Sequence, residues 1–256
     1  MKRAFAAAAL LCIATLAHAG RSCEQKAPQA HNIERAMNLA EHTARQLDTS
    51  GAQVVALARV GQNLSEYGQR YSHMGWAYRD GDRWYVAHKL NQCGSAVAVV
   101  YRQGLGEFFL DDLYDYQAGI VVLAPEAQAR LLPVLRSNAQ LAQLNTPRYS
   151  MVAYPWAQTY QQSNQWVLET LALSQDPTAQ TRERAQDWLQ RQGYQPATLH
   201  ISAFKRLGAR MTAANVAFDD HPNAKRFSDH IETVTVDSVF TWLNRSGLGG
   251  PVQVVR

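Results

Sequence analysis

Two histidines on neighbouring segments are the residues whose type and spacing could do chemistry in this sequence. His73 stands in Ser-His-Met-Gly-Trp, with Gly75 and Ala77 at the alternate positions that follow, and His88 comes later in the chain. Alternate residues of a strand share one face, so these small side chains leave space beside the His73 ring. The pattern predicts an accessible general base, oriented by His88 or by Asn91. The alternative is that both histidines are ordinary sheet residues, hydrogen-bonded to backbone.

Paired strands are expected to position these rings. The turn signal Asp80-Gly81-Asp82 separates two strand-like segments, 71–78 and 83–90, and so predicts a hairpin that carries both histidines. Alternating or continuous apolar runs predict further strands at 53–60, 96–101, 119–123 and 232–236.

Helical spacing of apolar residues accounts for most of the remaining chain. It predicts helices at 32–47, 125–137 and 163–174, a short helix within 104–113, a polar helix opened by Asp176-Pro177, a strand or helix near 199–207 and a helix ending near Asn244. We therefore expect an α+β fold, an antiparallel sheet of about five strands packed by helices, in one domain spanning residues 20–256.

The first nineteen residues have the pattern of a secretory signal peptide. Lys2 and Arg3 precede an apolar stretch, which ends in the small-x-small motif Ala17-His18-Ala19. Removing this segment lowers the formal net charge from +4 to +2. The sequence thus predicts a periplasmic or secreted protein with no transmembrane segment after cleavage. The small charge gives no reason to expect a nucleic-acid partner.

The cysteines that remain after cleavage are Cys23 and Cys93. In an oxidising compartment two such thiols tend to pair, so we expect a disulfide between them. The alternative is that Cys93 is a nucleophile assisted by His73 or His88, which a disulfide would prevent.

One acidic and histidine-rich stretch could suggest a metal site. It contains Asp219, Asp220, His221, Asp229, His230 and Glu232. No known ligand spacing is matched, and such residues are common in solvated loops, so we expect no metal and no cofactor.

The motifs around these residues resemble two groups of proteins. The Ser-His-x-Gly-aromatic strand, the hairpin and the later helix that begins Ser-Asn-Gln-Trp at Ser163 resemble the circularly permuted papain-like group, related to the NlpC/P60 hydrolases. More narrowly, the segment 60–75, Asn91-x-Cys93-Gly94 and the helix at 164–166 resemble an uncharacterised family of exported bacterial proteins, domain of unknown function family 2145.

The papain-like resemblance implies a hydrolase or acyl transferase that acts on an amide or ester. His73 would be the base, His88 the orienting group, and Ser163 would replace the usual cysteine nucleophile at the helix start. An alcohol cannot be held as an anion beside imidazolium as a thiol can. Serine is also a favoured helix N-cap, which alone explains its presence.

Two functions remain open from the sequence. The first is the hydrolase or acyl transferase, with a substrate such as peptidoglycan peptide or lipid. The second is an inactive member of the fold that binds an envelope component or an envelope protein. In both, we expect Tyr71, Trp76, Asn164 and Trp166 to contact the ligand, because rings near the hairpin could stack on sugar or peptide.

Overall fold

A mainly antiparallel, six-stranded sheet forms the centre of the protein. The computed structural model describes residues 29–256. The sheet has the order β4-β3-β2-β1-β5-β8, and a separate two-stranded sheet pairs β6 with β7. The strands are β1 (Val54–Val60), β2 (His73–Asp80), β3 (Arg83–Asn91), β4 (Ala98–Gly104), β5 (Asp115–Val122), β6 (Ala197–His200), β7 (His230–Thr233) and β8 (Gln253–Val255). The predicted α+β class is confirmed, and the sheet has one strand more than expected.

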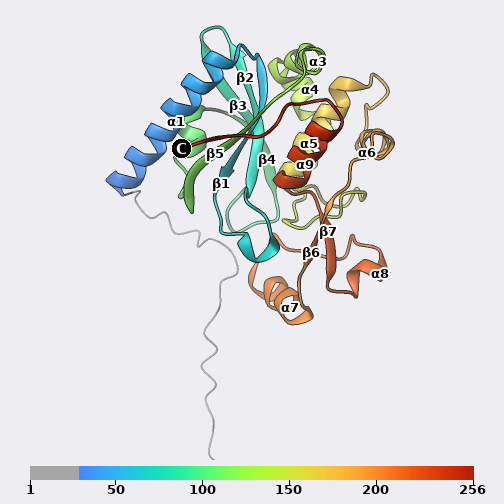
Figure 1. The fold of residues 1–256 in the computed structure, drawn as a ribbon. Helices are drawn as coiled ribbons and strands as arrows, with labels where there is room; N and C mark the ends of the chain where they lie inside the picture. The colour runs from blue at the N-terminus through green and yellow to red at the C-terminus, as the bar shows by residue number, and fades with distance from the viewer. Residues whose placement is uncertain (1–28) are drawn as a thin grey trace, which may run out of the picture.

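Helices cover both faces of the large sheet (Figure 1). They are α1 (Ala30–Ser50), α2 (Leu105–Phe109), α3 (Pro125–Arg136), α4 (Asn138–Gln143), α5 (Ser163–Gln175), α6 (Arg182–Arg191), α7 (Ala203–Thr212), α8 (Asn223–Arg226) and α9 (Val236–Arg245), with a 3₁₀ turn at Ser65–Tyr67. Side chains of α1 and α2 pack on one face, and those of α3, α5 and α9 pack on the other. The two faces thus have separate apolar cores.

The β2–β3 hairpin follows the sequence prediction closely. Its turn places Gly81 at φ 63°, in the left-handed region that favours glycine. The ladder pairs Trp76 with Ala87 and Tyr78 with Tyr85. Because residues alternate between faces, Met74, Trp76 and Tyr78 belong to the α5 side, and Ala77 belongs to the α1 side. This alternation decides where each histidine points.

The start of α6 differs from the prediction. The expected opening at Asp176-Pro177 is wrong, because the helix begins at Arg182 with Thr181 as its N-cap. Asp176 instead accepts hydrogen bonds from the backbone and the hydroxyl of Thr178, at 2.8 and 2.7 Å. A local Asx turn therefore competes with helix initiation there. The helix α4 and the strand β8 were not predicted from the sequence.

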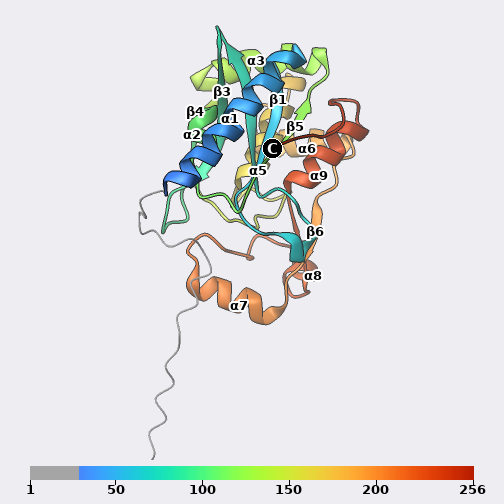
Figure 2. The ribbon, with the colours of Figure 1, turned by 60° about the vertical axis from the view of Figure 1, so that its left-hand side comes forward.

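A peripheral excursion leaves the main body between β6 and β7. It contains α7 and α8, and Figures 1 and 2 show both helices beyond one end of the large sheet. Its base is tied by the four-pair β6–β7 ladder and a small apolar cluster that includes Ile201, Phe218 and Ile231. The segment from Ile201 to Asp229 is called the excursion below.

The expected signal peptide and Cys23 lie outside the described residues, so export and the Cys23–Cys93 disulfide stay predictions. Between residues 29 and 256, no helix is both long enough and apolar enough to cross a bilayer.

Candidate functional site

The hairpin brings His73 and His88 into contact. His73 Nε2 lies 2.9 Å from His88 Nδ1, and His88 Nε2 lies 2.7 Å from Gln103 Oε1. The Gln103 amide in turn donates to Glu107 Oε1 at 2.9 Å. Because a carboxylate only accepts, the Gln103 NH₂ must face Glu107 and its oxygen must face His88. His88 therefore donates from Nε2, and His73 donates from Nε2 to the remaining His88 nitrogen, which leaves His73 Nδ1 as an acceptor.

Both imidazoles are held in their neutral form. Burial, the Arg59 guanidinium and the neighbouring His88 ring lower the pKa of His73 well below its usual value. Burial and Arg59 lower the pKa of His88 to about 3. The Phe108 ring contacts both, with centroids 6.0 Å from His73 and 5.2 Å from His88. The pair is thus set in an apolar and electropositive environment.

Ser163 lies on the other side of the sheet. It is the first residue of α5, and the N-cap is Gln162, so the N-cap interpretation of Ser163 is wrong. Gln162 and Gln165 form a reciprocal capping box that takes this role. Ser163 is buried and hydrogen-bonded to Tyr149, whose pKa is raised by burial.

The β2–β3 hairpin and the start of α5 do meet, through the backbone of β2 and a side chain of α5. Asn164 Oδ1 accepts a hydrogen bond of 3.2 Å from the Met74 amide. The Met74 side chain points toward α5, so the His73 side chain points toward α2 and contacts Phe108. The structure therefore brings His73 and His88 together and does not bring either ring to Ser163.

The four expected ligand contacts are all buried. Trp76 donates to the Val167 carbonyl at 3.0 Å, and Trp166 is fully enclosed in the same core. Tyr71 packs against Phe240. With Asn164 bonded to β2, these side chains hold α5 and α9 against the sheet and present no accessible stacking surface.

Asn91 also has a local structural role. Its amide donates to the carbonyls of Ser95 and Val97, at 2.8 and 2.9 Å, and its oxygen accepts from Asn215. These bonds fix the connection between β3 and β4.

A buried charged network, which the sequence did not lead us to expect, lies beneath α5. Glu169 accepts hydrogen bonds from Arg182 Nε at 2.8 Å and from Gln186 at 2.7 Å, and also from Gln161. Gln161 Oε1 accepts from Lys89 Nζ at 2.7 Å. Glu169 is the lone charged residue in the apolar stretch of its helix. This position is the sequence signal that could have predicted a buried charged network.

Lys89 is the ionisable group in this network with a lowered pKa. Burial and, to a lesser extent, the Arg182 guanidinium lower the pKa of Lys89 to about 7, and Glu169 acts in the opposite direction. The ammonium group donates to the Thr146 carbonyl at 2.6 Å as well as to Gln161. All these partners come from the protein itself, so the network joins β3, α5 and α6.

The α7 helix has an unusual orientation, because its apolar face points outward. Phe204, Leu207 and Met211 share a face at helical spacing and are 89, 59 and 78% exposed. On the opposite side of the helix, the Arg206 guanidinium lies 5.9 Å from the Phe218 ring and hydrogen-bonds to the Arg226 carbonyl, both within the excursion. We call Phe204, Leu207 and Met211 the α7 surface.

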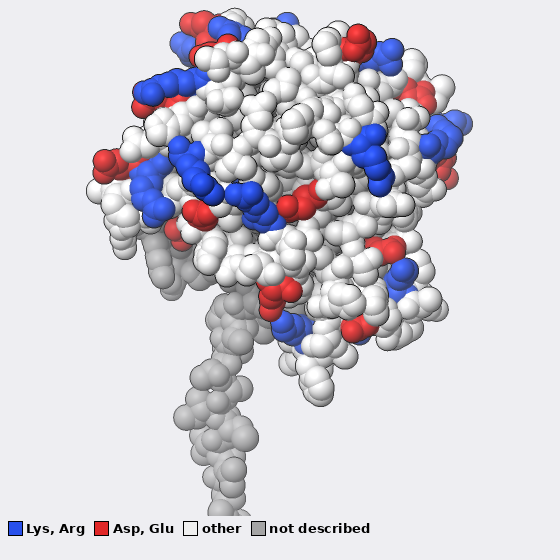
Figure 3. Space-filling view, viewed as in Figure 1, with Lys and Arg blue, Asp and Glu red and all other residues white. Residues whose placement is uncertain are grey.

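Basic residues accompany the α7 surface. Lys205, Arg206 and Arg210 lie on the same helix, and neither α7 nor α8 contains an acidic residue. Lys205 pairs with Glu66 at 2.8 Å, whereas Arg210 is exposed. Basic and acidic side chains are interspersed over the molecular face in Figure 3.

The acidic and histidine-rich stretch 219–232 is buried at His221 and exposed at Asp229 and His230. Both ring nitrogens of His221 are engaged, with Asp220 at 3.0 Å and the Glu232 carbonyl at 2.9 Å. Asp229 and His230 are exposed and lie beside His200. These three residues are the described ones whose side chains could hold a metal together.

Comparison with known proteins identifies the family. A family model described as "Uncharacterized protein conserved in bacteria (DUF2145)" matches residues 46–243. The chain belongs to the DUF2145 family. The family model covers the His73–His88 pair, α5 and α7 of this DUF2145 chain. Searches of curated proteins and of solved structures gave no match.

Proposed function

We propose that this DUF2145 protein is a non-catalytic member of the permuted papain-like group that binds the anionic lipid surface of the cell envelope through α7. The observation that carries the proposal is the outward apolar face of α7. A helix that packs on its own protein normally turns this face inward. Here the apolar face is available to a partner, and the basic residues of the same helix favour an anionic one.

The energetics of the α7 surface suit a reversible membrane contact. Full burial of one large apolar side chain contributes about 1.5–3 kcal/mol, and the α7 surface offers three. A short helix with Phe and Leu on one face and Lys or Arg beside them is typical of segments that lie in the lipid headgroup region. Each basic residue near an anionic surface adds about 1 kcal/mol.

Charge favours lipid over a second copy of the chain. The segment 203–227 contains five basic residues and two acidic ones. Lys205 and Lys225 are paired with Glu66 and Glu232, so Arg206, Arg210 and Arg226 supply the charge that no described ion pair offsets. Two such segments would repel each other if α7 packed on α7. Phe227, also largely exposed, follows Lys225 and Arg226 and repeats the pairing of an aromatic ring with basic residues.

The position of His73 supports a binding role over hydrolysis. A serine nucleophile needs a base within hydrogen-bond reach, about 2.6–3.2 Å, or somewhat farther without ligand. His73 lies on the α2 face, and Ser163 is hydrogen-bonded to Tyr149 beneath α5. The meeting of Asn164 with the Met74 amide supports a papain-like arrangement of helix and strand without its catalytic pair.

Sedimentation with lipid vesicles tests the proposal. The full mature chain should bind vesicles of phosphatidylglycerol and phosphatidylcholine, and binding to phosphatidylcholine alone should be at least about tenfold weaker. Phe204→Ala should weaken binding to the anionic vesicles about tenfold, because it removes most of one buried ring. Leu110→Ala is the matched control, since Leu110 is an exposed apolar residue outside α7.

Two results would overturn the proposal. One is equal sedimentation of wild type and Phe204→Ala with anionic vesicles. The other is self-association that Phe204→Ala abolishes, which would make the α7 surface a protein interface. For the enzymatic hypothesis, labelling by a fluorophosphonate that is lost in Ser163→Ala would show a reactive serine. We expect no labelling.

A further inference from the structure

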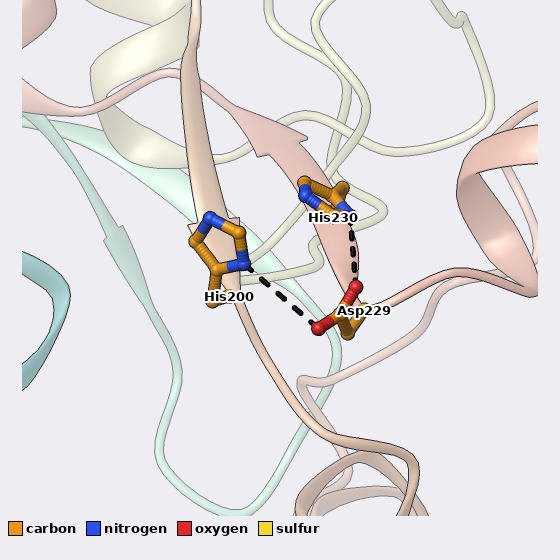
Figure 4. Close-up of side chains that lie close together, drawn as sticks. All are labelled: His200, Asp229 and His230. Atoms are coloured by element: carbon orange, nitrogen blue, oxygen red, sulfur yellow. Dashed lines mark ion pairs between the residues drawn. The ribbon is translucent and has the colours of Figure 1, made fainter.

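A second feature of the excursion lies at its base, where two strands place three metal-ligating side chains together. His200 ends β6 and His230 begins β7, and the ladder pairs these residues directly. Their ring centroids are 4.4 Å apart. Asp229 precedes His230 and turns its carboxylate toward both rings, as Figure 4 shows.

The distances suit a small divalent cation. Asp229 Oδ1 lies 2.8 Å from His230 Nδ1, and Oδ2 lies 3.9 Å from His200 Nδ1. One ligand atom from each residue can be chosen so that all lie within 4.8 Å of one another. Zinc binds nitrogen and oxygen ligands at about 2.0–2.2 Å, which separates tetrahedral ligands by roughly 3.3 Å. Small rotations of exposed side chains bring these three donors to that spacing.

The donor types select among metals. Two imidazoles and one carboxylate match zinc and the neighbouring late transition metals, whereas Mg²⁺ and Ca²⁺ prefer sites built from oxygen. The side chains of His200, Asp229 and His230 are 68, 56 and 51% exposed. Water can therefore complete the coordination without rearrangement of the fold.

We propose that His200, Asp229 and His230 form a Zn²⁺ site that fastens the base of the excursion. The β6–β7 ladder places both rings on one face, and the hydrogen bond to His230 holds the carboxylate beside them. Together the three side chains offer two nitrogen donors and one oxygen donor to a cation. The site does not depend on whether α7 binds lipid.

The position of the site gives the metal a structural consequence. The Ile201 amide donates to the Asp229 carbonyl at 2.8 Å, so the two stems of the excursion already meet at this point. A metal bound by β6 on one side and β7 on the other cross-links these stems. Opening of the base would then require loss of the metal, and the excursion would open less often.

Isothermal titration of the chain with ZnCl₂ alone, without vesicles and after tag removal, tests the proposal. We expect about one equivalent to bind, with His230→Ala weakening binding at least about tenfold. His31→Ala is the matched control, because it removes an exposed histidine from α1. MgCl₂ should give no comparable binding.

Limited proteolysis tests the consequence for the excursion. Trypsin can cut after Lys205, Arg206 or Arg210 when the excursion opens. With free Zn²⁺ at 100 times its dissociation constant, opening should fall about 100-fold if only the closed form binds the metal. Cleavage of wild type should slow accordingly, and cleavage of His230→Ala should not. Absence of zinc binding, or equal binding by wild type and His230→Ala, would overturn the site, and unchanged cleavage would overturn its fastening role.

Discussion

The interface beneath α5 and the excursion differ in which side chains they bury. The first buries charged groups, and the second exposes large apolar ones. Beneath α5, the Glu169 and Arg182 side chains are 0 and 7% exposed and hydrogen-bonded to each other. On α7, large apolar side chains face outward, and the Arg206 guanidinium packs against Phe218 within the excursion. The first region satisfies its charges within the protein, whereas the second leaves apolar surface for something else to cover.

This difference indicates where function lies. Buried polar networks with every partner supplied internally fix one packing arrangement. The His73–His88–Gln103 chain is also bonded within the protein, with His73 Nδ1 as its remaining acceptor. An exposed apolar face has no such internal role. The excursion is therefore the better candidate for contact with a partner, and four predictions test the distinction.

Breaking the buried ion pair should give the largest effect. Glu169→Ala leaves the Arg182 guanidinium buried without its carboxylate and should lower the free energy of unfolding by about 3–5 kcal/mol. Urea unfolding followed by circular dichroism measures this change. Glu41→Ala is the matched control, because its pair with Arg45 is exposed and should contribute no more than about 1 kcal/mol. Equal effects of the two substitutions would contradict the claim that the buried Glu169–Arg182 pair stabilises the fold more than an exposed pair does.

Filling the space at Gly75 should give the next largest effect. A Cβ there would lie 2.7 Å from the Ala87 carbonyl oxygen and 2.8 Å from His88 Cβ. Because backbone cannot yield easily, Gly75→Ala should destabilise the protein by about 1–3 kcal/mol in the same assay. Gly104→Ala has nothing within 4 Å of the new Cβ and should change stability by less than about 0.5 kcal/mol. A neutral Gly75→Ala would show that the hairpin packs more loosely than described.

Lys89 should make stability depend on pH. Its pKa is about 7 in the folded protein against 10.5 unfolded, so the unfolded chain binds the proton more strongly. The stability of wild type relative to Lys89→Met should then rise between about pH 7 and pH 10.5, by on the order of 1 kcal/mol per pH unit. Below pH 7 the difference should be constant. Urea unfolding of both proteins at pH 6, 7.5 and 9 measures it, and a flat difference would show that Lys89 keeps its charge.

The smallest effect is expected from a single charge on α7. Arg210→Ala should weaken binding to anionic vesicles by about 1 kcal/mol, roughly fivefold, with little change in stability. The loss should shrink as salt rises from 50 to 500 mM, because screening weakens surface attraction. Arg83→Ala, on the exposed hairpin turn, is the control and should bind as wild type does. Equal loss in both variants would point to net charge rather than to α7.

Much of the fold could be predicted from the sequence because its signals are local. The Asp80-Gly81-Asp82 turn and the apolar spacing of α5 gave a hairpin and a helix in the right places. The opening of α6 could not be predicted, because Asp176 bonds within a turn before the helix begins. Short elements such as β8 are stabilised by pairing with distant residues, here β5, and carry little local signal.

The candidate site was harder to predict, because the direction in which a side chain of a helix or strand points depends on tertiary packing. Spacing correctly paired His73 with His88, yet it could not tell which face of the sheet α5 would cover. The spacing of Phe204, Leu207 and Met211 predicts an amphipathic helix, but a sequence does not say that its apolar side faces outward. Likewise, the pairing of His200 with His230 follows from the β6–β7 register, across 30 residues of chain.

Hydrogen exchange with and without anionic vesicles tests the central claim most directly. Lipid contact through α7 predicts that amide exchange slows in residues 203–212 on addition of phosphatidylglycerol vesicles, while exchange in α5 and in the β2–β3 hairpin stays the same. Slowing confined to the hairpin, or no slowing in 203–212, would contradict the account.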